Sequence, residues 1–405
     1  MSISISRGSD SVSVSLVPDV ILNKRCESVI RESPLNIVSL YPFQKICASL
    51  VISRLRNPGF SMYDCDLCVS APTGQGKTLA YLLPIVHSVL ELPSRGVRAI
   101  IAVPTRDLAI QVESVASLFG VPTMCLIGQR SMAAEKSSLV RSSIVVATIG
   151  RLIDHLVIGS LDLSFLEWLV VDEADRMLSK SDLDKWAIIL RSVPRTVQRL
   201  LFSATMTDNP LKLNALKLMR PLFVKSTASS NTTTNKYIVV PNASMRVRCL
   251  LYLLEEFHET SKILIFCNST ENVVSLAALL ARFGKPTSAF SGNMTGKSRE
   301  KLVAKFVNGT VGCLVCTDVV TRGMDFPNVE IVINYDLPNY ATTYIHRAGR
   351  TGRADKSGTV ITICESKQMR HFRQKVIDIS TCEKIRIDFS ALIKHSQLDP
   401  HDKTD

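Results

Sequence analysis

Short apolar runs alternate with amphipathic stretches along most of this 405-residue chain, and this alternation limits the possible fold more than any other feature. Stretches with helical spacing separate the runs, for example residues 78–90 and 106–119. In the first half the apolar runs lie at 67–71, 98–103, 123–127, 143–147, 168–171 and 199–202. Continuous apolar runs suit strands that are buried on both faces. The pattern therefore predicts a parallel sheet flanked by helices.

The alternation lapses at residues 227–236, TASSNTTTNK, where the only apolar side chain is that of Ala228. It resumes with runs at 237–240, 262–267, 287–290, 313–316, 329–334 and 359–363. A chain of this length exceeds one ordinary core. We therefore expect two tandem α/β domains joined by a flexible linker. Their predicted bounds are 1–20 for a disordered or loosely attached tail, 21–226 for the first domain, 227–236 for the linker, 237–385 for the second domain and 386–405 for a C-terminal tail.

The formal net charge is +12, with a pI of about 9.2, which favours a polyanionic partner such as nucleic acid. A merely basic surface is the other reading, because charge alone does not name a partner. No apolar run approaches the roughly 20 residues that cross a bilayer, and the first residues, MSISISRGSD, lack the pattern of a secretory signal. We expect an intracellular protein without membrane attachment.

The chain has 11 cysteines, which we expect to be reduced. Cys65 with Cys68, and Cys313 with Cys316, have the spacing of metal ligands, but both pairs lie in strand-like runs. Residues three apart in a strand point to opposite faces, so neither pair can close on one ion. Buried small apolar side chains are the better interpretation.

The segment APTGQGKT, residues 71–78, follows an apolar run and precedes a helical stretch, which is the context of a phosphate-binding loop. Gly74 and Gly76 allow the backbone to turn its N–H groups inward. Lys77 supplies a positive charge for the β- and γ-phosphates, and Thr78 supplies a hydroxyl for Mg²⁺. The helix expected to begin at Thr78 directs its positive end at the same anion.

Three carboxylates, Asp172, Glu173 and Asp175, directly follow the apolar run at 168–171. Acidic residues favour the first turn of a helix, so a helix start alone could explain them. With a phosphate loop in the same chain, Asp172 is placed to hold Mg²⁺, and Glu173 to deprotonate the attacking water. The two readings are compatible.

Further polar clusters follow other apolar runs: PTRDLA at 104–109, TIGR at 148–151 and SAT at 203–205. In open α/β sheets, ligands bind beyond the carboxyl ends of the strands. The repetition favours a functional sheet edge over a series of ordinary polar loops.

Together these motifs resemble the DEAD-box ATP-dependent RNA helicases of superfamily 2, whose fold is two tandem RecA-like domains. The resemblance covers roughly residues 41–363 in the family's order and spacing. Its further elements are Phe43-Gln44, IFCNST at 265–270, TDVVTRGMD at 317–325 and HRAGRTGR at 346–353. The chain departs from the family pattern at Glu27, Gln129, Ile149 and Gly296, none of which belongs to the phosphate chemistry.

The resemblance implies ATP and Mg²⁺ as cofactors. It implies that Gln44 reads adenine, that Asp325 lies near the ribose, and that Arg350 and Arg353 reach the γ-phosphate. The implied nucleotide-binding set is Phe43, Gln44, Thr73, Gly74, Gln75, Gly76, Lys77, Thr78 and Asp325, with Thr78 and Asp172 at the metal. The implied catalytic set is Glu173, Lys77, Arg350, Arg353, Ser203, Thr205 and His346; Ser203 and Thr205 couple hydrolysis to domain closure, and His346, with Asp175, helps to tie the domains together.

The resemblance also implies an RNA surface that contacts the backbone without reading sequence. Its residues are Thr105, Arg106, Gly128, Thr148, Arg151, Asn268, Arg299 and Thr317. The implied protein acts as a monomer with protein cofactors. Residues 66–74 and 128–129 look most like the branch linked to large ribosomal subunit assembly, which implies a nuclear or nucleolar location, with the cytoplasm as the alternative.

Two other functions stay open on the residues alone. One is an ATP-gated RNA clamp or scaffold that holds RNA for partners without productive unwinding. The other is a DNA-acting relative, against which the DEAD sequence at 172–175 and Gln44 argue. The identity of the substrate RNA does not follow from the sequence.

Overall fold

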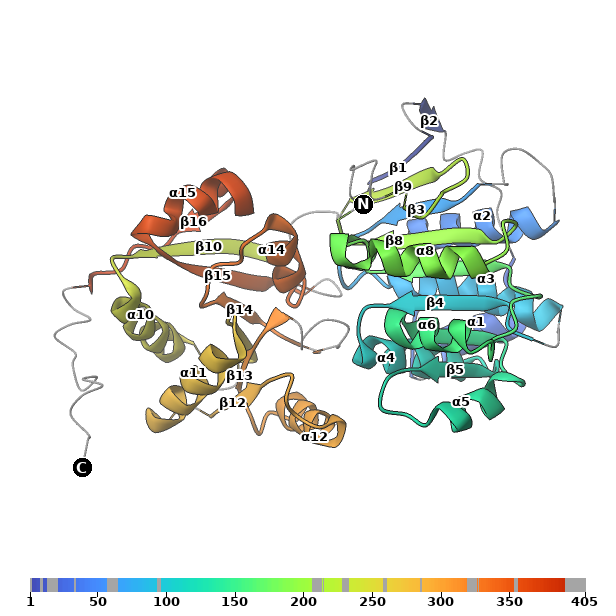
Figure 1. Cartoon of the computed structure of the whole chain (residues 1–405). Coiled ribbons are helices and arrows are strands. Elements are labelled where there is room, and N and C mark those ends of the chain that lie inside the picture. The colour runs from blue at the N-terminus through green and yellow to red at the C-terminus, as the bar shows by residue number, and fades with distance from the viewer. Residues whose placement is uncertain are drawn as a thin grey trace. The chain divides into compact units, whose positions relative to one another are not determined.

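A computed structural model of the chain describes residues 2–7, 10–12, 21–32, 34–56, 65–92, 96–205, 213, 215–227, 233–257, 261–284, 286–318, 326, 328–352 and 356–389. The chain divides into two compact units, Met1–Ser230 and Asn231–Asp405. Each unit contains one sheet with helices on both faces, as Figure 1 shows. The predicted class, two tandem α/β domains of RecA-like form, is confirmed.

The sheet of the first unit has nine strands in the order β2-β1-β9-β3-β8-β7-β4-β6-β5 within the described residues. The strands from β9 to β5 are parallel to one another. Their bounds are β1 Ser2–Arg7, β2 Asp10–Val12, β3 Leu67–Ser70, β4 Ala99–Val103, β5 Thr123–Leu126, β6 Ile144–Thr148, β7 Trp168–Asp172, β8 Gln198–Ser203 and β9 Leu222–Thr227. All six predicted strands of this domain are present.

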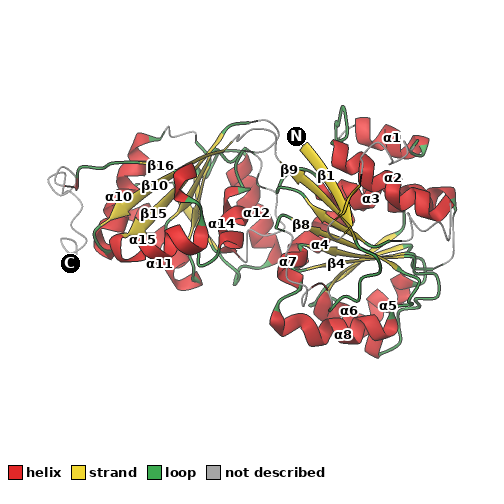
Figure 2. Cartoon of the chain, turned by 90° about the horizontal axis from the view of Figure 1, so that it is seen from above, coloured by secondary structure: helices red, strands yellow, loops and turns green. Residues whose placement is uncertain are grey.

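Helices cover both faces of this sheet, as the view in Figure 2 shows. Helices α1, α2, α3 and α4 lie on one face, and α5, α6 and α8 lie on the other. The bounds are α1 Lys24–Arg31, α2 Pro42–Arg56, α3 Lys77–Glu91, α4 Arg106–Leu118, α5 Met132–Leu139, α6 Ile149–Val157, α7 Ala174–Met177, the 3₁₀ turn Lys180–Asp182 and α8 Leu183–Ser192.

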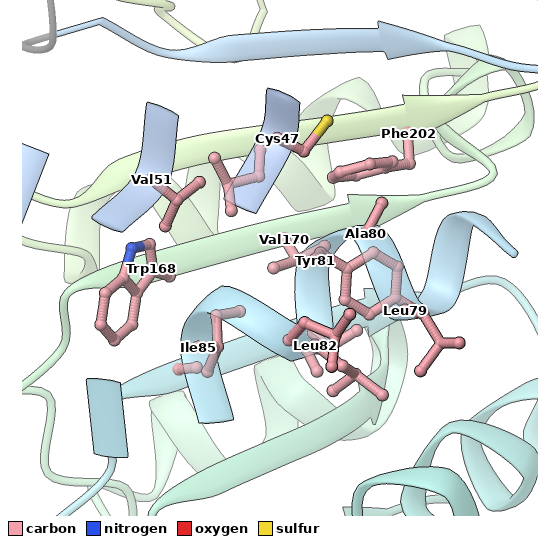
Figure 3. Packing of buried hydrophobic residues seen from close by; sticks show 14 of the residues in the cluster. Cys47, Val51, Leu79, Ala80, Tyr81, Leu82, Ile85, Trp168, Val170 and Phe202 are labelled. Carbon is pink, nitrogen blue, oxygen red and sulfur yellow. The ribbon is translucent and has the colours of Figure 1, made fainter. Parts of the chain in front are cut away.

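Alternate residues of each central strand point into the two hydrophobic layers, one on each face of the sheet. Trp168 and Val170 of β7 pack against α2 and α3, whereas Leu169 and Val171 pack into the layer beneath α6 and α8. Figure 3 shows the first layer, in which Tyr81 of α3 contacts Phe202 of β8 edge-on with ring centroids 5.1 Å apart. Burial on both faces explains why the predicted strands read as continuous apolar runs.

The cysteine pairs lie as the sequence predicted. Cys65 belongs to one layer of the first unit and Cys68 to the other. Cys313 and Cys316 are divided in the same way between the two layers of the second unit. Members of each pair therefore face opposite sides of their sheet and serve as small core side chains.

The second unit has seven parallel strands in the order β12-β13-β11-β14-β15-β10-β16 within its described residues. Helices α10 and α11 pack on one face, and α12 and α14 on the other. The bounds are β10 Thr233–Val240, β11 Ile263–Phe266, β12 Thr287–Phe290, β13 Cys313–Cys316, β14 Ile331–Asn334, β15 Gly358–Glu365, β16 Glu383–Lys384, α10 Ala243–Glu256, α11 Thr270–Arg282, α12 Gly296–Val307, α14 Ala341–Ala348 and α15 Met369–His371. Short helical turns occupy Ser366–Gln368, Phe372–Val376 and Ile379–Thr381.

The expected loose tail at residues 1–20 is wrong for residues 2–7 and 10–12, which form β1 and β2. Strand β1 pairs antiparallel with β9, with Ile5 opposite Val224, and the Ile5 side chain is only 2% exposed. Strand β9 would otherwise leave a row of backbone groups at the sheet edge without partners. The alternation of serine and isoleucine places Ile3 and Ile5 on the core side. Residues 8, 9 and 13–20 lie outside the described part of the chain.

The linker and the end of the second domain also differ from their predicted bounds. Strand β10 begins at Thr233, inside the expected linker at 227–236, because it pairs along its whole length with β15. Ile385, Ile387 and Phe389 pack against the core of the second unit, so its packing continues past the expected end at residue 385. Residues 390–405 lie outside the described part.

The described helices include none that is both long enough and apolar enough to cross a membrane.

Replacing Ile5 with Ala should lower the free energy of unfolding of the first unit by about 2 kcal/mol, because it leaves a cavity beneath β1. Urea denaturation monitored by tryptophan fluorescence measures this loss, since Trp168 and Trp186 both lie in the first unit. Ser4→Ala is the matched control, because Ser4 is exposed on the same strand. Equal stability of the two variants would contradict the burial of Ile5.

Candidate functional site

The strand order of the first unit sorts the sequence motifs into two neighbouring groups along one sheet edge. Strands β3, β8 and β7 are adjacent, and the phosphate loop, SAT and DEAD segments follow their carboxyl ends. Strands β4, β6 and β5 come next, followed by Thr105-Arg106, Thr148 to Arg151, and Gly128. The residues predicted to bind nucleotide thus lie beside those predicted to bind RNA.

The phosphate loop runs from Ala71 to Gly76 and turns at two glycines with left-handed backbone, Gly74 with φ 79° and Gly76 with φ 71°. Helix α3 begins at Lys77, one residue earlier than predicted. The Lys77 ammonium donates to the carbonyl oxygens of Ala71 and Pro72, at 2.9 and 3.1 Å. Its charge therefore lies over the loop, at the amino end of a 15-residue helix.

Gln44 of α2 clamps this loop. Its Nε2 donates to the carbonyl of Gly76 at 2.9 Å and to that of Gln75 at 3.4 Å, while its Oε1 accepts from the Tyr41 N–H at 2.7 Å. The positive φ of Gly76 favours glycine, and a Cβ there would lie 2.6 Å from Gln44 Nε2 and displace that carboxamide from the loop. The Gln44 carboxamide therefore makes hydrogen bonds within the protein, beside the predicted phosphate-binding loop. Phe43, the residue before it, is fully buried in the core.

Asp172 ends β7 and is only 4% exposed. The Tyr81 hydroxyl donates to its Oδ2 at 2.9 Å, and the Glu173 N–H donates to its Oδ1 at 2.8 Å. Burial raises the pKa of Asp172 to about 6, and repulsion from Glu173 adds to the rise, although the Lys77 charge and the two donors oppose it. Tyr81 is one turn after Thr78 on α3, so the side chain that donates to Asp172 comes from the same helix as the other residue predicted to hold metal.

Glu173 adopts a left-handed backbone conformation, φ 48°, between β7 and α7. Non-glycine residues at positive φ are uncommon and often mark functional sites. Its Oε2 is buried, yet it has no hydrogen-bond partner among the described residues. A buried carboxylate oxygen left in this way is suited to accept a proton or hydrogen bond from a ligand or water.

Asp175 and the SAT segment are joined by hydrogen bonds. The Thr205 hydroxyl donates to Asp175 Oδ2, the Thr205 N–H donates to Ser203 Oγ at 3.1 Å, and Ser203 Oγ donates back to the Thr205 carbonyl at 3.0 Å. Two segments far apart in the chain, each predicted to act in catalysis, are therefore connected within one unit.

The predicted RNA residues of the first unit differ in how they are held. The Thr105 hydroxyl caps α4, and Arg106 lies so close to Gly128 that a Cβ there would be 3.2 Å from its Nη2. Thr148 occupies the N-cap position of α6 without making a side-chain cap. The Arg151 side chain is mostly buried, and its Nε donates to Glu135 Oε2 at 2.7 Å.

In the second unit, Arg347 of α14 is the centre of a buried network. It donates from Nε and Nη2 to the two carboxylate oxygens of Asp318, at 2.7 and 2.8 Å. It also donates to Asn334 Oδ1, to the Asp336 carbonyl and to Asn268 Oδ1. Since the Asn268 NH₂ group donates to the Leu337 carbonyl at 3.0 Å, both ends of this predicted RNA-binding carboxamide point inward.

The remaining predicted residues of the second unit are placed as follows. Arg299 in α12 donates to the Gly292 carbonyl at 2.7 Å, and Thr317, just after β13, is buried. His346 and Arg350 are also buried, at 8% and 6% exposure. Asp325 and Arg353 lie outside the described residues.

Four residues that hold these sites together were not predicted from the sequence: Tyr81, Glu135, His155 and Arg347. Tyr81 and His155 lie in helices with apolar faces and read there as core residues. Glu135 reads as a surface residue of a short helix. No local signal marks them, because their partners come from other strands and helices.

A model of the DEAD/DEAH box helicase family matches residues 47–213, and a model of the helicase conserved C-terminal domain matches residues 245–355. The zebrafish protein ATP-dependent RNA helicase DDX51 is 34% identical over 91% of this chain and 65% of its own length. Rice DEAD-box ATP-dependent RNA helicase 1 is 31% identical over 89% of this chain and 84% of its own length. The chain spans less than two thirds of the zebrafish, mouse and nematode relatives.

Among solved structures, the chain is similar to Mss116p bound to single-stranded RNA and AMP-PNP. The TM-score is 0.77 at 28% identity, over 91% of this chain and 78% of that one. A second structure, Mss116 bound to single-stranded RNA and UDP-BeF, gives 0.78 at 29% identity, over 92% and 80% of the two chains.

Replacing Tyr81 with Phe should destabilise the first unit by about 1–3 kcal/mol at pH 8, because ionised Asp172 loses a hydrogen bond. A raised folded pKa means that burial of Asp172 costs stability once pH rises from its unfolded value of 3.8 through about 6. The Tyr81→Phe penalty should therefore shrink below pH 5, where Asp172 is protonated. Urea denaturation at several pH values measures this loss of unfolding free energy.

Tyr344→Phe is the matched control, because Tyr344 donates to the neutral carboxamide of Asn235 at 2.9 Å. Its penalty should not change between pH 5 and 8. A Tyr81→Phe penalty equally independent of pH would contradict the raised pKa of Asp172.

Proposed function

Because the chain belongs to the DEAD/DEAH box helicase family, we propose that it is an ATP-dependent RNA helicase. RNA would stimulate its ATP hydrolysis, and hydrolysis would drive local unwinding of short duplexes or remodelling of RNA–protein complexes. The supporting observation is that the Lys77 loop, buried Asp172 and Glu173 meet at one edge of the sheet, with Glu173 Oε2 lacking a hydrogen-bond partner among the described residues. Several relatives carry the name ATP-dependent RNA helicase.

In the proposed reaction Glu173 accepts a proton from the attacking water, and Lys77 stabilises the β- and γ-phosphates. Oxygen atoms of Thr78 and Asp172 suit Mg²⁺, a cation that prefers such ligands. Bound Mg²⁺ would neutralise charge on the phosphates. Tyr81 keeps Asp172 oriented, since its hydroxyl donates to Asp172 Oδ2 at 2.9 Å.

For nucleotide binding, we propose that the loop residues Thr73 to Thr78 enclose the phosphates and that Gln44 reads adenine. The bond between Gln44 and the Gly76 carbonyl supports a link between base recognition and the loop conformation. Phe43 supports Gln44 from the core, and Asp325 contacts the ribose.

For coupling, we propose that Ser203, Thr205 and Asp175 transmit the state of the nucleotide, which their mutual hydrogen bonds support. His346 takes part in the same coupling from the second unit. Arg350 and Arg353 stabilise the charge that develops on the γ-phosphate, because a guanidinium fork matches its oxygens. Hydrolysis then requires both units.

The proposed RNA surface binds the sugar–phosphate backbone and does not read sequence. In the first unit it comprises Thr105, Arg106, Gly128, Thr148 and Arg151, and in the second Asn268, Arg299 and Thr317. Because both ends of the Asn268 side chain are used internally, its contribution is to hold the loop after β11 in position.

We further infer a monomer that works with protein cofactors in assembly of the large ribosomal subunit, located in the nucleus or nucleolus. The resemblance to that branch supports this inference, and the alternative location is the cytoplasm. Immunofluorescence against a nucleolar marker tests it; uniform cytoplasmic staining would contradict it.

The alternative function is an ATP-gated RNA clamp, which the same residues would support. Strand displacement separates the two, since a helicase releases the short strand of a duplex in repeated cycles with ATP. A clamp would bind RNA with ATP or a non-hydrolysable analogue and release no strands catalytically.

In the ATPase assay, wild-type hydrolysis should rise on addition of RNA and not of DNA. Glu173→Gln should abolish hydrolysis while ATP and RNA still bind, because the carboxamide cannot accept the proton of the attacking water. Asp184→Asn, an exposed acid of α8, is the matched control and should hydrolyse ATP normally. Wild-type turnover by Glu173→Gln would remove Glu173 from the role of base.

Arg350→Ala should slow RNA-stimulated hydrolysis by about 10³-fold, the usual effect of losing such an arginine, with nucleotide affinity nearly unchanged. Arg350→Lys keeps the charge but loses the fork, so it should also be slow. Single-turnover hydrolysis and binding of a fluorescent nucleotide measure the two quantities, and thermal unfolding checks the fold. Normal turnover by both variants would exclude Arg350 from the chemical step.

A further inference from the structure

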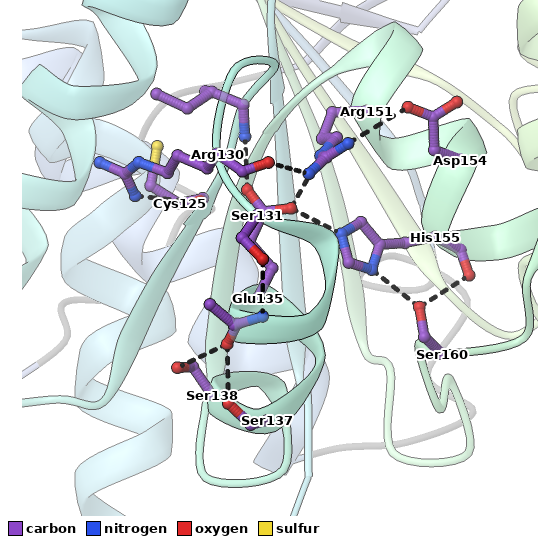
Figure 4. Close-up of polar contacts among 12 residues, drawn as sticks. Cys125, Arg130, Ser131, Glu135, Ser137, Ser138, Arg151, Asp154, His155 and Ser160 are labelled. Atoms are coloured by element: carbon purple, nitrogen blue, oxygen red, sulfur yellow. Dashed lines mark hydrogen bonds and ion pairs between the residues drawn. The ribbon is translucent and has the colours of Figure 1, made fainter.

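A buried ionic cluster lies behind the proposed RNA surface of the first unit, and the proposed reaction makes no use of it. Glu135 of α5 accepts from two side chains of α6 on the same oxygen, Oε2: Arg151 Nε at 2.7 Å and His155 Nε2 at 2.9 Å. The Glu135 and His155 side chains are 2% and 0% exposed. His155 Nδ1 lies 2.7 Å from the Ser160 hydroxyl, as Figure 4 shows.

The cluster also connects the segments that carry the proposed RNA contacts. Glu135 Oε1 accepts from the Ile127 N–H at 3.4 Å, just after β5. Arg151 Nη2 donates to the Arg130 carbonyl at 2.6 Å. The turn from Ile127 to Arg130 includes Gly128, so one carboxylate and one guanidinium tie this turn to the amino end of α6.

The third nitrogen of Arg151, Nη1, is held among the described residues only by a long ion pair with Asp154. Nη1 makes no hydrogen bond to another described residue, and its nearest carboxylate is the exposed Asp154 at 3.8 Å. The Arg151 side chain is 12% exposed. Its long side chain could adopt many rotamers in water, whereas the bond to Glu135 selects one of them.

A purely structural role would require only that the ions be paired, because an unpaired buried charge is costly. The first unit contains such a pair elsewhere: Arg98 and Glu167 bond at 2.8 and 2.9 Å beside the amino ends of β4 and β7. That pair lies at the strand ends opposite to the proposed ligand edge. The Glu135 cluster differs because its arginine comes from the RNA-facing TIGR segment.

We propose that Glu135 and His155 are positioning residues for RNA binding. They hold the Arg151 guanidinium and the turn at 127–130 in one fixed arrangement at the RNA edge. The inference rests on the proposed function, since it gives Arg151 an RNA phosphate to meet.

The test is a double-mutant cycle on single-stranded RNA binding to the full chain with a non-hydrolysable ATP analogue. Glu135→Gln should weaken RNA binding about tenfold, the scale of one hydrogen bond to a charged group. Arg151→Gln keeps a donor for Glu135 but removes the charge. Adding Glu135→Gln to Arg151→Gln should weaken binding no further, because the carboxamide oxygen can still accept from the Ile127 N–H and the lost charge acts through Arg151.

Salt dependence gives a second readout that a structural role would not change. Loss of one phosphate contact lowers the slope of log K against log salt by about 0.7 on a single strand. Glu135→Gln and Arg151→Gln should each show this reduction. Glu167→Gln is the matched control: it removes the same charge from a pair whose arginine is buried and whose carboxylate is half-buried, and it should leave the slope and RNA affinity unchanged.

Variants at His155 keep the proposal testable if Glu135→Gln folds poorly. His155→Gln retains an N–H donor for Glu135 and should bind RNA nearly as well as wild type, whereas His155→Leu should bind weakly. Basal ATPase without RNA should be unchanged in both variants, because His155 lies outside the proposed nucleotide site.

Equal losses from Glu135→Gln in the wild-type and Arg151→Gln backgrounds, or an unchanged salt slope, would overturn the positioning role while leaving the helicase proposal intact. A wild-type chain that binds no RNA would overturn the proposed function, and this inference with it.

Discussion

Parallel pairing of strands in register is the constraint on which the functional edge depends. Ser70 pairs with Ser203, Asp172 with Phe202, and Val103 with Thr148, so these strands end at one level. Every loop that follows a strand therefore starts from a common line, whatever its position in the chain. Burial of both sheet faces by helices leaves this line as the place where polar side chains from many strands can meet.

Arg347 of the second unit and Asp172 of the first are buried charges with opposite surroundings. Arg347 is satisfied within its own unit by a bidentate carboxylate, two amides and a carbonyl, so it holds the loops after β11, β13 and β14 together. Asp172 has a neutral hydroxyl and one N–H as its donors, and burial raises its pKa to about 6. An acid in such surroundings gains most from a cation, which is why the first unit suits a charged ligand.

Much of the fold and of the candidate site could be predicted, because the sequence patterns that mark them are local. The buried strands read as apolar runs, and the phosphate loop carries its glycines, lysine and threonine in order. What could not be predicted depends on partners distant in the chain. Strand β1 is held by β9, Gln44 clamps a loop beyond the next strand, and Glu135 lies in a short helix whose sequence looks solvent-exposed. Pairing across the fold overrides the local pattern at each of these positions.

The sequence by itself determined which chemistry the chain carries, because residue types and their spacing fix what can bind a phosphate, a metal or a proton. The order of the strands was decided only by the tertiary structure. Chain order places DEAD after the TIGR segment and far from the predicted phosphate loop. The sheet order β3-β8-β7-β4-β6-β5 brings DEAD and SAT next to that loop and groups the segments proposed to contact RNA beside them. Hydrogen bonds between distant strands set that order, and no local pattern encodes it.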